Sequence, residues 1–176
     1  MRSANAFCHF CGTSLPAGAY PRTCTGCGAQ IWANPIPVAV ALVPLESGLL
    51  VIRRAIPPAI GKLALPGGFV EDHETWQHGA AREVREETGI VIDPHALQPF
   101  WYTSTEPKPN RVLLFAVSAP PLEVPAFETD TETSERGVIH GPEGLDEVFA
   151  FSLHAEAARR YFASRSITGA HGFAPR

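Results

Sequence analysis

The chain has 176 residues, 45% apolar and 18% charged, which is enough apolar material for one ordinary globular core. Its formal net charge of −4 argues against bulk electrostatic binding of a nucleic-acid backbone, although a nucleotide could still occupy a local pocket. No apolar stretch approaches the roughly 20 residues of a membrane span, and the N-terminus lacks the apolar segment of a signal peptide. We therefore expect a cytoplasmic protein without a membrane partner.

The N-terminal segment has little hydrophobic periodicity and needs a cross-link to hold a structure. Two C-x-x-C pairs contain all the cysteines of the chain: Cys8 with Cys11, and Cys24 with Cys27. Two such pairs supply four thiolates for a tetrahedral zinc ion. Disulfides or free buried thiols are the alternatives, but disulfides are disfavoured in the cytosol and do not explain two matched C-x-x-C-G turns. We predict a structural zinc ribbon over residues 1–34.

Prolines 35 and 37 mark the end of this segment, and the main domain is predicted to span residues 35–166. Hydrophobic patterning predicts extended segments at residues 38–43, 49–54, 90–92, 97–104, 111–117 and 137–140. It predicts helices at residues 74–88 and 151–164, a long loop at 119–135 and a frayed, flexible tail at 167–176. Asp72 or His73 is expected near the start of the first helix, and Gly89 is expected to end it. Strands and helices mixed in this way favour a mixed sheet flanked by helices.

The first of these helices has three carboxylates on one face. Glu83, Glu86 and Glu87 are spaced i, i+3 and i+4, so their side chains converge within one turn. Three such groups repel one another unless a cation lies between them, and Mg²⁺ or Mn²⁺ prefers oxygen ligands of this kind. A solvated acidic face balanced by arginines explains this run equally well when it is taken alone.

The surrounding motif separates these two interpretations. The pattern G-x5-E-x7-R-E-U-x-E-E-x-G-U, with U aliphatic, is complete over residues 68–90. On this motif the chain resembles the Nudix hydrolases. The resemblance implies an α/β fold, the Nudix α/β/α sandwich with a mixed sheet. It implies a metal site formed by Gly68, Glu83, Glu86 and Glu87, with Glu74 and Arg82 supporting those ligands.

Such a site supports hydrolysis of a phosphoanhydride bond, for which a carboxylate serves as general base. Some Nudix pyrophosphatases take this base from a loop that lies far beyond the motif in the sequence. Here the acidic run at residues 128–135 is the source that we expect, with Glu135 as first choice and Glu132 as second. A solvated loop is the alternative for either residue.

A ribbon ahead of a Nudix domain is similar to the NADH pyrophosphatases, but residues 98–104 do not match their Ser-Gln-Pro-Trp-Pro-Phe-Pro-like run. The arrangement is more similar to the branch that includes ADP-ribose and FAD pyrophosphatases. We predict that Arg54 and the backbone at Gly67 contact the phosphates and that Phe69 or Trp101 stacks a flat ring. Ordinary core or loop packing is the alternative for both aromatic residues.

The expected function is therefore Mg²⁺-dependent cleavage of a nucleoside diphosphate derivative, with release of a nucleoside monophosphate. The alternatives are an NADH or NAD pyrophosphatase, an RNA-cap-removing hydrolase and a non-catalytic nucleotide sensor. Intact Glu86 and Glu87 oppose the sensor. Residues 8–33 have Arg22 as their one basic residue, which opposes a nucleic-acid partner. The resemblance also allows a homodimer.

Overall fold

The computed structural model describes residues 6–106, 110–129 and 131–176. The chain divides between Pro35 and Ile36 into two compact units, each described here by itself. The smaller unit contains the antiparallel pair β1 (Arg22–Thr23) and β2 (Gln30–Ile31). Its buried residues are Cys8, Leu15, Cys24 and Ile31, so the thiols themselves form part of its small core.

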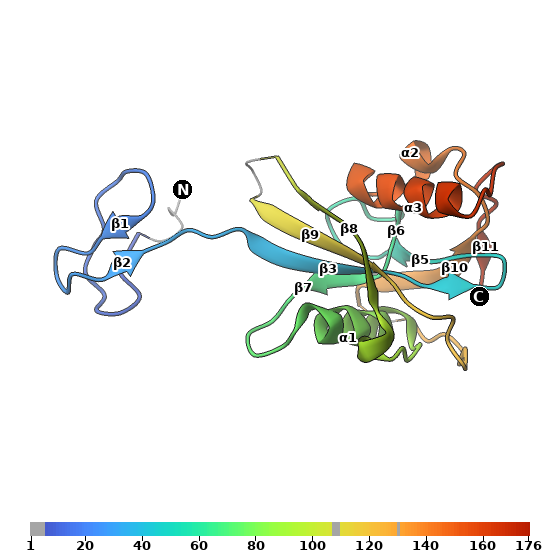
Figure 1. Ribbon diagram of the computed structural model, residues 1–176, viewed down its shortest axis with the longest axis horizontal. Helices are drawn as coiled ribbons and strands as arrows, with labels where there is room; N and C mark the ends of the chain where they lie inside the picture. Colours follow the sequence, from blue (N-terminus) through green and yellow to red (C-terminus); the bar gives the residue numbers. More distant parts are fainter. Residues whose placement is uncertain (1–5, 107–109, 130) are drawn as a thin grey trace. The chain divides into compact units, whose positions relative to one another are not determined.

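The larger unit contains two sheets and the helices of the chain (Figure 1). One sheet has the order β7 (Gly67–Phe69), β3 (Ile36–Leu42), β9 (Arg111–Val117) and β8 (Gln98–Ser104). Its β3 and β9 are parallel and its other pairs antiparallel. The other has the order β11 (Ala174–Pro175), β10 (Thr133–Ile139), β5 (Gly48–Arg54) and β4 (Pro44–Leu45), with β6 (Leu63–Ala64) also paired to β5.

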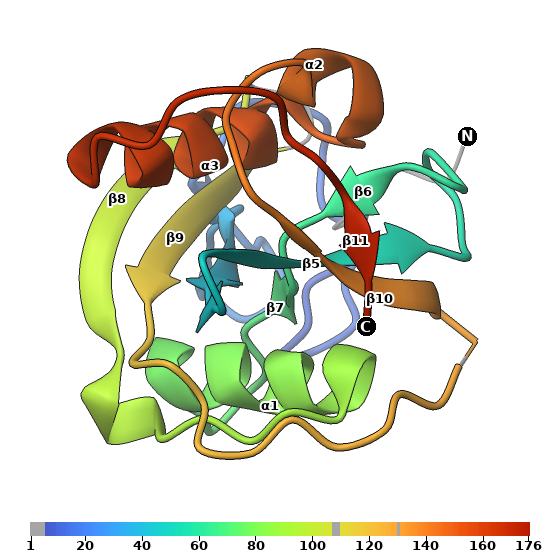
Figure 2. The same ribbon diagram turned by 90° about the vertical axis from the view of Figure 1, so that its right-hand side faces the viewer.

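Helices cover both sides of these strands. Figure 2 shows α1 (Trp76–Thr88) on one side and α2 (Leu145–Val148) with α3 (Ser152–Ser164) on the other. Alternate residues of β3 serve the two cores: Ala39 and Ala41 pack with α1, while Val40 and Leu42 pack with α3. The α/β/α sandwich with a mixed sheet is thereby confirmed. No helix in the described ranges is long and apolar enough to cross a membrane.

The start of α1 differs from the prediction. Thr75 caps the helix, with its Oγ1 accepting a hydrogen bond from the backbone N–H of His78. Asp72 and His73, expected there, instead form an exposed ion pair with each other. The last residue of α1 is Thr88, and Gly89 ends the helix as predicted.

Two extended segments also differ from the prediction. Residues 90–92 form no strand; Ile90 and Ile92 are buried, and the short 3₁₀ turn η1 (Pro94–Ala96) follows them. Conversely, β10 begins at Thr133, inside the expected loop, so Glu135 lies within the strand rather than before it. β10 pairs with β5 along its length, a long-range contact that local patterning does not reveal.

The C-terminal residues, which were predicted to be frayed, make defined contacts instead. β11 pairs antiparallel with β10, and Arg176 forms an ion pair with Glu46 at 2.8 Å. The ring of Phe173 occupies the space beside Gly137, where a Cβ would approach it within 2.2 Å. These contacts join residues far apart in sequence, so the composition of the tail alone could not predict them.

Candidate active site

The metal-ligand candidates lie on α1 because the helix places its apolar residues on the opposite side. Ala80 and Val84 are fully buried against β3, while the same periodicity leaves Glu86 exposed and Glu83 half-buried against β7. Glu87 lies between these two faces and is only 7% exposed. The three carboxylates are therefore presented at different depths at one end of the helix.

The two glycines of β7 bring the backbone against these carboxylates. Gly67 has a φ of +154°, and a Cβ there would lie 2.4 Å from the carbonyl oxygen of Ala39, so the position excludes any other residue. Its N–H donates to Oε2 of Glu87 at 2.9 Å. A Cβ on Gly68 would lie 2.3 Å from Oε1 of Glu83. The spacing of strand and helix thus depends on both glycines.

Arg82 gathers the acidic groups around one guanidinium. Its Nη1 donates to Oε1 of Glu83 at 2.9 Å and to Oε2 of Glu86 at 3.0 Å. Its Nη2 donates to Oε1 of Glu74 at 2.9 Å and to the carbonyl of Phe69 at 3.0 Å. The hydrogen bond from Arg82 lowers the pKa of Glu74. Arg82 therefore orients the carboxylates, as the Nudix resemblance implies.

Burial raises the pKa of two of the carboxylates, so without a cation they are harder to ionise. Burial raises the pKa of Glu87 to about 8, against an ordinary value of 4.5. Burial also raises the pKa of Glu83, and the negative charge of Glu132 adds to the effect at both residues. The positive charge of Arg54 acts in the opposite direction on Glu87. The charges of Glu132 and Arg54 therefore both act on this group of carboxylates.

These residues fit a hard divalent cation. The donor set consists of carboxylate oxygens and nearby backbone, and the cation would supply the positive charge that buried Glu87 lacks. The glycines leave no Cβ between β7 and the carboxylate of Glu83, so that carboxylate packs directly against the backbone of β7. The site is thus formed from one helix turn and one short strand.

Glu135, the first-choice general base, lies in a different environment from Glu132. Its Oε2 accepts a 2.6 Å hydrogen bond from Nε of Arg53, directly across from it on β5. The Arg53 guanidinium also lies 4.8 Å from the ring centre of Phe173. Glu135 is thus paired with an arginine, while the negative charge of Glu132 contributes to the raised pKa of Glu83 and of Glu87.

The predicted substrate residues are only partly brought together. The positive charge of Arg54 acts on Glu87, and its Nε donates to the carbonyl of Pro58 at 2.9 Å. Phe69 follows Gly68 directly and is 47% exposed, with the guanidinium of Arg111 4.9 Å from its ring centre. Because side chains alternate along a strand, the Phe69 ring points to the other face of β7 from the position where a Cβ on Gly68 would meet Glu83.

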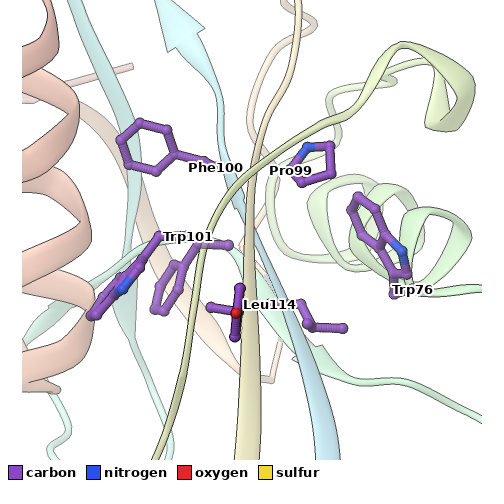
Figure 3. A pocket seen from close by; sticks show the side chains of 7 residues that line it. Trp76, Pro99, Phe100, Trp101 and Leu114 are labelled. Carbon is purple, nitrogen blue, oxygen red and sulfur yellow. The ribbon is translucent and has the colours of Figure 1, made fainter.

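Trp101 lies elsewhere. It stacks on Phe115 at 5.1 Å between ring centres, and the guanidinium of Arg160 lies 4.4 Å from its ring centre. It lines an apolar hollow of about 430 Å³ at the bulged edge of the sheet (Figure 3). The hollow is lined by Trp76, Pro99, Phe100, Trp101, Tyr102, Leu114 and Phe115. Trp76 is the first residue of α1 and Glu87 lies near its end. At about 1.5 Å of rise per residue, these two positions are roughly 16 Å apart along the helix.

In the smaller unit, the four cysteines form one cluster. Their sulfur atoms all lie within 4.8 Å of one another, with Cys8 and Cys27 3.7 Å apart and Cys11 and Cys24 3.6 Å apart. The two C-x-x-C turns share one backbone pattern. In each, the N–H of the glycine that follows donates to the backbone carbonyl of the first cysteine at 2.8 Å. Hydrogen bonding to Thr13 lowers the pKa of Cys11 to about 6, whereas hydrogen bonding to Cys11 and burial raise the pKa of Cys27 to about 12. This geometry is suited to a tetrahedral metal ion.

Comparison with known proteins agrees with the geometry of the larger unit. The model of the NUDIX domain matches residues 35–164, which is most of the chain. The chain belongs to the Nudix family. A Nudix hydrolase from Nitrosomonas europaea has a similar structure, with a TM-score of 0.76 and 26% identity, covering 91% of this chain and 92% of that one. The family assignment makes this chain a Nudix hydrolase, a class that generally uses a divalent metal.

Two curated relatives differ in what their names describe. The NAD-capped RNA hydrolase NudC of Stutzerimonas stutzeri is 38% identical over 96 residues, 52% of this chain and 34% of that protein. The ADP-ribose pyrophosphatase of Methanocaldococcus jannaschii is 36% identical over 62 residues, 35% of this chain and 37% of that protein. This chain thus spans little more than a third of the length of either relative.

Arg136 is a residue near this site that sequence reasoning missed. It is only 2% exposed, and its Nη1 donates to the carbonyl of Thr88, the last residue of α1, at 2.6 Å. A buried arginine directly after an expected acidic loop gives no local signal. Recognition that β10 begins at Thr133 would have placed residue 136 on a buried strand and marked it as unusual.

Proposed function

We propose that this protein is a Mg²⁺- or Mn²⁺-dependent pyrophosphohydrolase that cleaves the diphosphate of a nucleoside diphosphate derivative and releases a nucleoside monophosphate. The observation that supports this most is the joint position of Glu83 and Glu87 against the two glycines of β7. When bound, the cation would neutralise diphosphate charge and make a water molecule more acidic. Glu83, Glu86, Glu87 and the backbone at Gly68 would hold it.

The other residues have separate roles in this proposal. Arg82 and Glu74 hold the ligand carboxylates in orientation through the hydrogen bonds described above. Arg54 faces the same region and would attract the negative diphosphate. The exposed ring of Phe69, next to the glycines, offers a face for a flat base or sugar-linked ring. Trp101 is a weaker candidate for this role because it lines the hollow beside the start of α1.

We assign the general base to Glu132 in preference to Glu135. Glu132 is exposed, and its charge acts on Glu83 and Glu87. A base must reach a water molecule beside the cation, and Glu132 is the residue of the acidic run whose charge acts on both buried carboxylates. Replacement of Glu132 by Gln should lower kcat by about 10² to 10⁴-fold and remove the acidic limb of its pH profile.

Glu135→Gln is the matched control for this assignment. It removes one charge from the same strand region but loses only a part-exposed ion pair, which contributes about 0–1 kcal/mol. We expect its kcat to stay within a few-fold of wild type. The opposite ranking of the two variants would return the role to Glu135.

The substrate class that we favour is ADP-ribose or FAD, for which the sequence pattern and the archaeal relative are the support. The relative named as an NAD-capped RNA hydrolase supports an NAD- or NADH-type substrate as a second candidate. For capped RNA, a ribbon that binds phosphates would be an advantage. Arg22, however, donates to the carbonyls of Gly18 and Pro16 and lies over Tyr20, so its guanidinium is already engaged.

A substrate panel tests the proposal directly. Purified protein with Mg²⁺ is incubated with ADP-ribose, FAD, NADH, NAD-capped RNA and nucleoside triphosphates, and release of nucleoside monophosphate is measured. We expect turnover of at least one diphosphate-linked substrate, and its abolition in Glu86→Gln. Glu147→Gln, an exposed change on α2, is the control that should retain full activity. Binding of nucleotides without any turnover would instead indicate a sensor.

The four cysteines are proposed to hold a structural zinc ion. Support comes from their close approach and from the two equivalent turns that present them. A closed set of four thiolates leaves no coordination position for a substrate, so zinc would stabilise the smaller unit without entering the reaction. Metal analysis of freshly purified protein should find about one zinc per chain, and its absence would contradict this assignment.

A further inference from the structure

Arg136 is a buried positive charge with unusual partners. It is 2% exposed, and both of its described hydrogen-bond acceptors are backbone carbonyls: Thr88 at 2.6 Å and Pro125 at 2.8 Å. Within the described ranges its Nε has no hydrogen-bond partner. The guanidinium also lies 5.5 Å from the ring centre of Phe127. Burying such a charge costs several kcal/mol, and an apolar side chain of similar volume would often be no less stable.

The first acceptor, the carbonyl of Thr88, lies at the end of the helix that contains the proposed metal ligands. Carbonyls in the last turn of a helix lack intrahelical partners and bear partial negative charge, so a cation there is favourable. Thr88 is completely buried and follows Glu87, whose carboxylate accepts from Gly67. A short path of bonded groups therefore joins Arg136 to the carboxylate site.

The second acceptor lies on the segment that leads to the proposed base. Figure 2 shows the chain after β9 running along α1 before it reaches β10. Pro125 lies on this segment, close enough to Gly89 for a Cβ there to meet its Cγ at 3.6 Å. The same segment continues to Glu132 at the start of β10. One planar guanidinium thus bonds the helix end and this segment at once, a geometry that its fixed donors suit.

We propose that Arg136 is a positioning residue that holds the last turn of α1 in register with the segment leading to Glu132. This inference rests on the proposed function, because it assigns a purpose to the relative position of the metal ligands and the base. A residue with only a structural role would affect stability and leave cation affinity unchanged. Outer groups that orient metal ligands typically change affinity or activity by about 10- to 100-fold.

The test compares three variants by Mn²⁺ binding, followed by electron paramagnetic resonance, and by kcat and KM. Arg136→Met keeps the volume and removes both bonds. Arg136→Lys keeps the charge but has no planar fork to bond both carbonyls. Arg85→Met is the control, since it removes an exposed positive charge from the same last turn. Mn²⁺ is a hard ion and should leave a thiolate zinc site intact.

We expect Arg136→Met to bind Mn²⁺ about 10-fold more weakly and to lose at least as much in kcat, with KM little changed. Arg85→Met should stay within about twofold of wild type, a margin well below the 10-fold effect. A folded Arg136→Met with wild-type Mn²⁺ affinity overturns the proposal, whatever its melting temperature. If Arg136→Met does not fold, Arg136→Lys decides: weaker binding supports the proposal and unchanged binding overturns it.

The same measurements separate this inference from the proposed function. Wild-type protein that binds Mn²⁺ but turns over no substrate of the panel would remove the function, while the variant comparison would still judge Arg136. Wild-type protein that binds no Mn²⁺ would remove both.

Discussion

The buried carboxylate of Glu87 leads to a prediction about stability and pH. Burial raises its pKa to about 8 from an ordinary 4.5. Between those pH values the folded protein holds a proton that the unfolded chain has released. The stabilisation is therefore complete below about pH 4.5 and is lost as the pH rises through about 8. Burial raises the pKa of Glu83 as well, so it acts in the same direction.

His154 opposes this effect in part of the range. It is fully buried, and burial lowers its pKa from 6.5 to about 3, so stability from this group grows as the pH rises to about 6.5 and then stays constant. The effect of Glu87 should consequently be clearest between pH 6.5 and 8. At about 1.4 kcal/mol per pH unit, and less near the pKa itself, we expect a loss of about 1–2 kcal/mol.

Urea unfolding of cation-free protein at several pH values in this window measures the loss. No chelator is added, so the proposed zinc stays in place, and Glu87→Gln is the matched variant that keeps every other titrating group. As the pH rises from 6.5 to 8, wild type should lose about 1–2 kcal/mol more stability than Glu87→Gln, because only Glu87 differs between the two proteins. Saturating Mg²⁺ should flatten the wild-type profile, since the cation replaces the proton. Parallel profiles for the two proteins would refute the burial argument.

Three further predictions concern other contacts. Gly68→Ala should reduce Mg²⁺ activation and kcat at least about tenfold, because its Cβ would lie 2.3 Å from the carboxylate of Glu83; Mg²⁺ titration of the activity measures this. Cys27→Ser should lose zinc and unfold the smaller unit while retaining turnover, as metal analysis and amide exchange would show. Deletion of residues 171–176 should cost about 2–4 kcal/mol, because it removes β11 and opens a cavity beside Gly137; urea unfolding tests this.

The sequence by itself determined the main features of this protein. The helix that holds Glu83, Glu86 and Glu87 follows from local periodicity, and its end at Gly89 follows from a local backbone preference. The grouping of the four cysteines follows likewise from two short turns of matching spacing. These features depend on residues close together in the chain, so their spacing contains the information needed to predict them.

The tertiary structure decided the features that depend on strand pairing. The register of β10 against β5 places Glu135 opposite Arg53 and leaves Glu132 to act on the carboxylates, a distinction absent from the acidic run itself. The same strand buries Arg136 beneath the end of α1. Such outcomes arise from contacts between distant segments, and a one-residue change of register would reverse which side chains face the core.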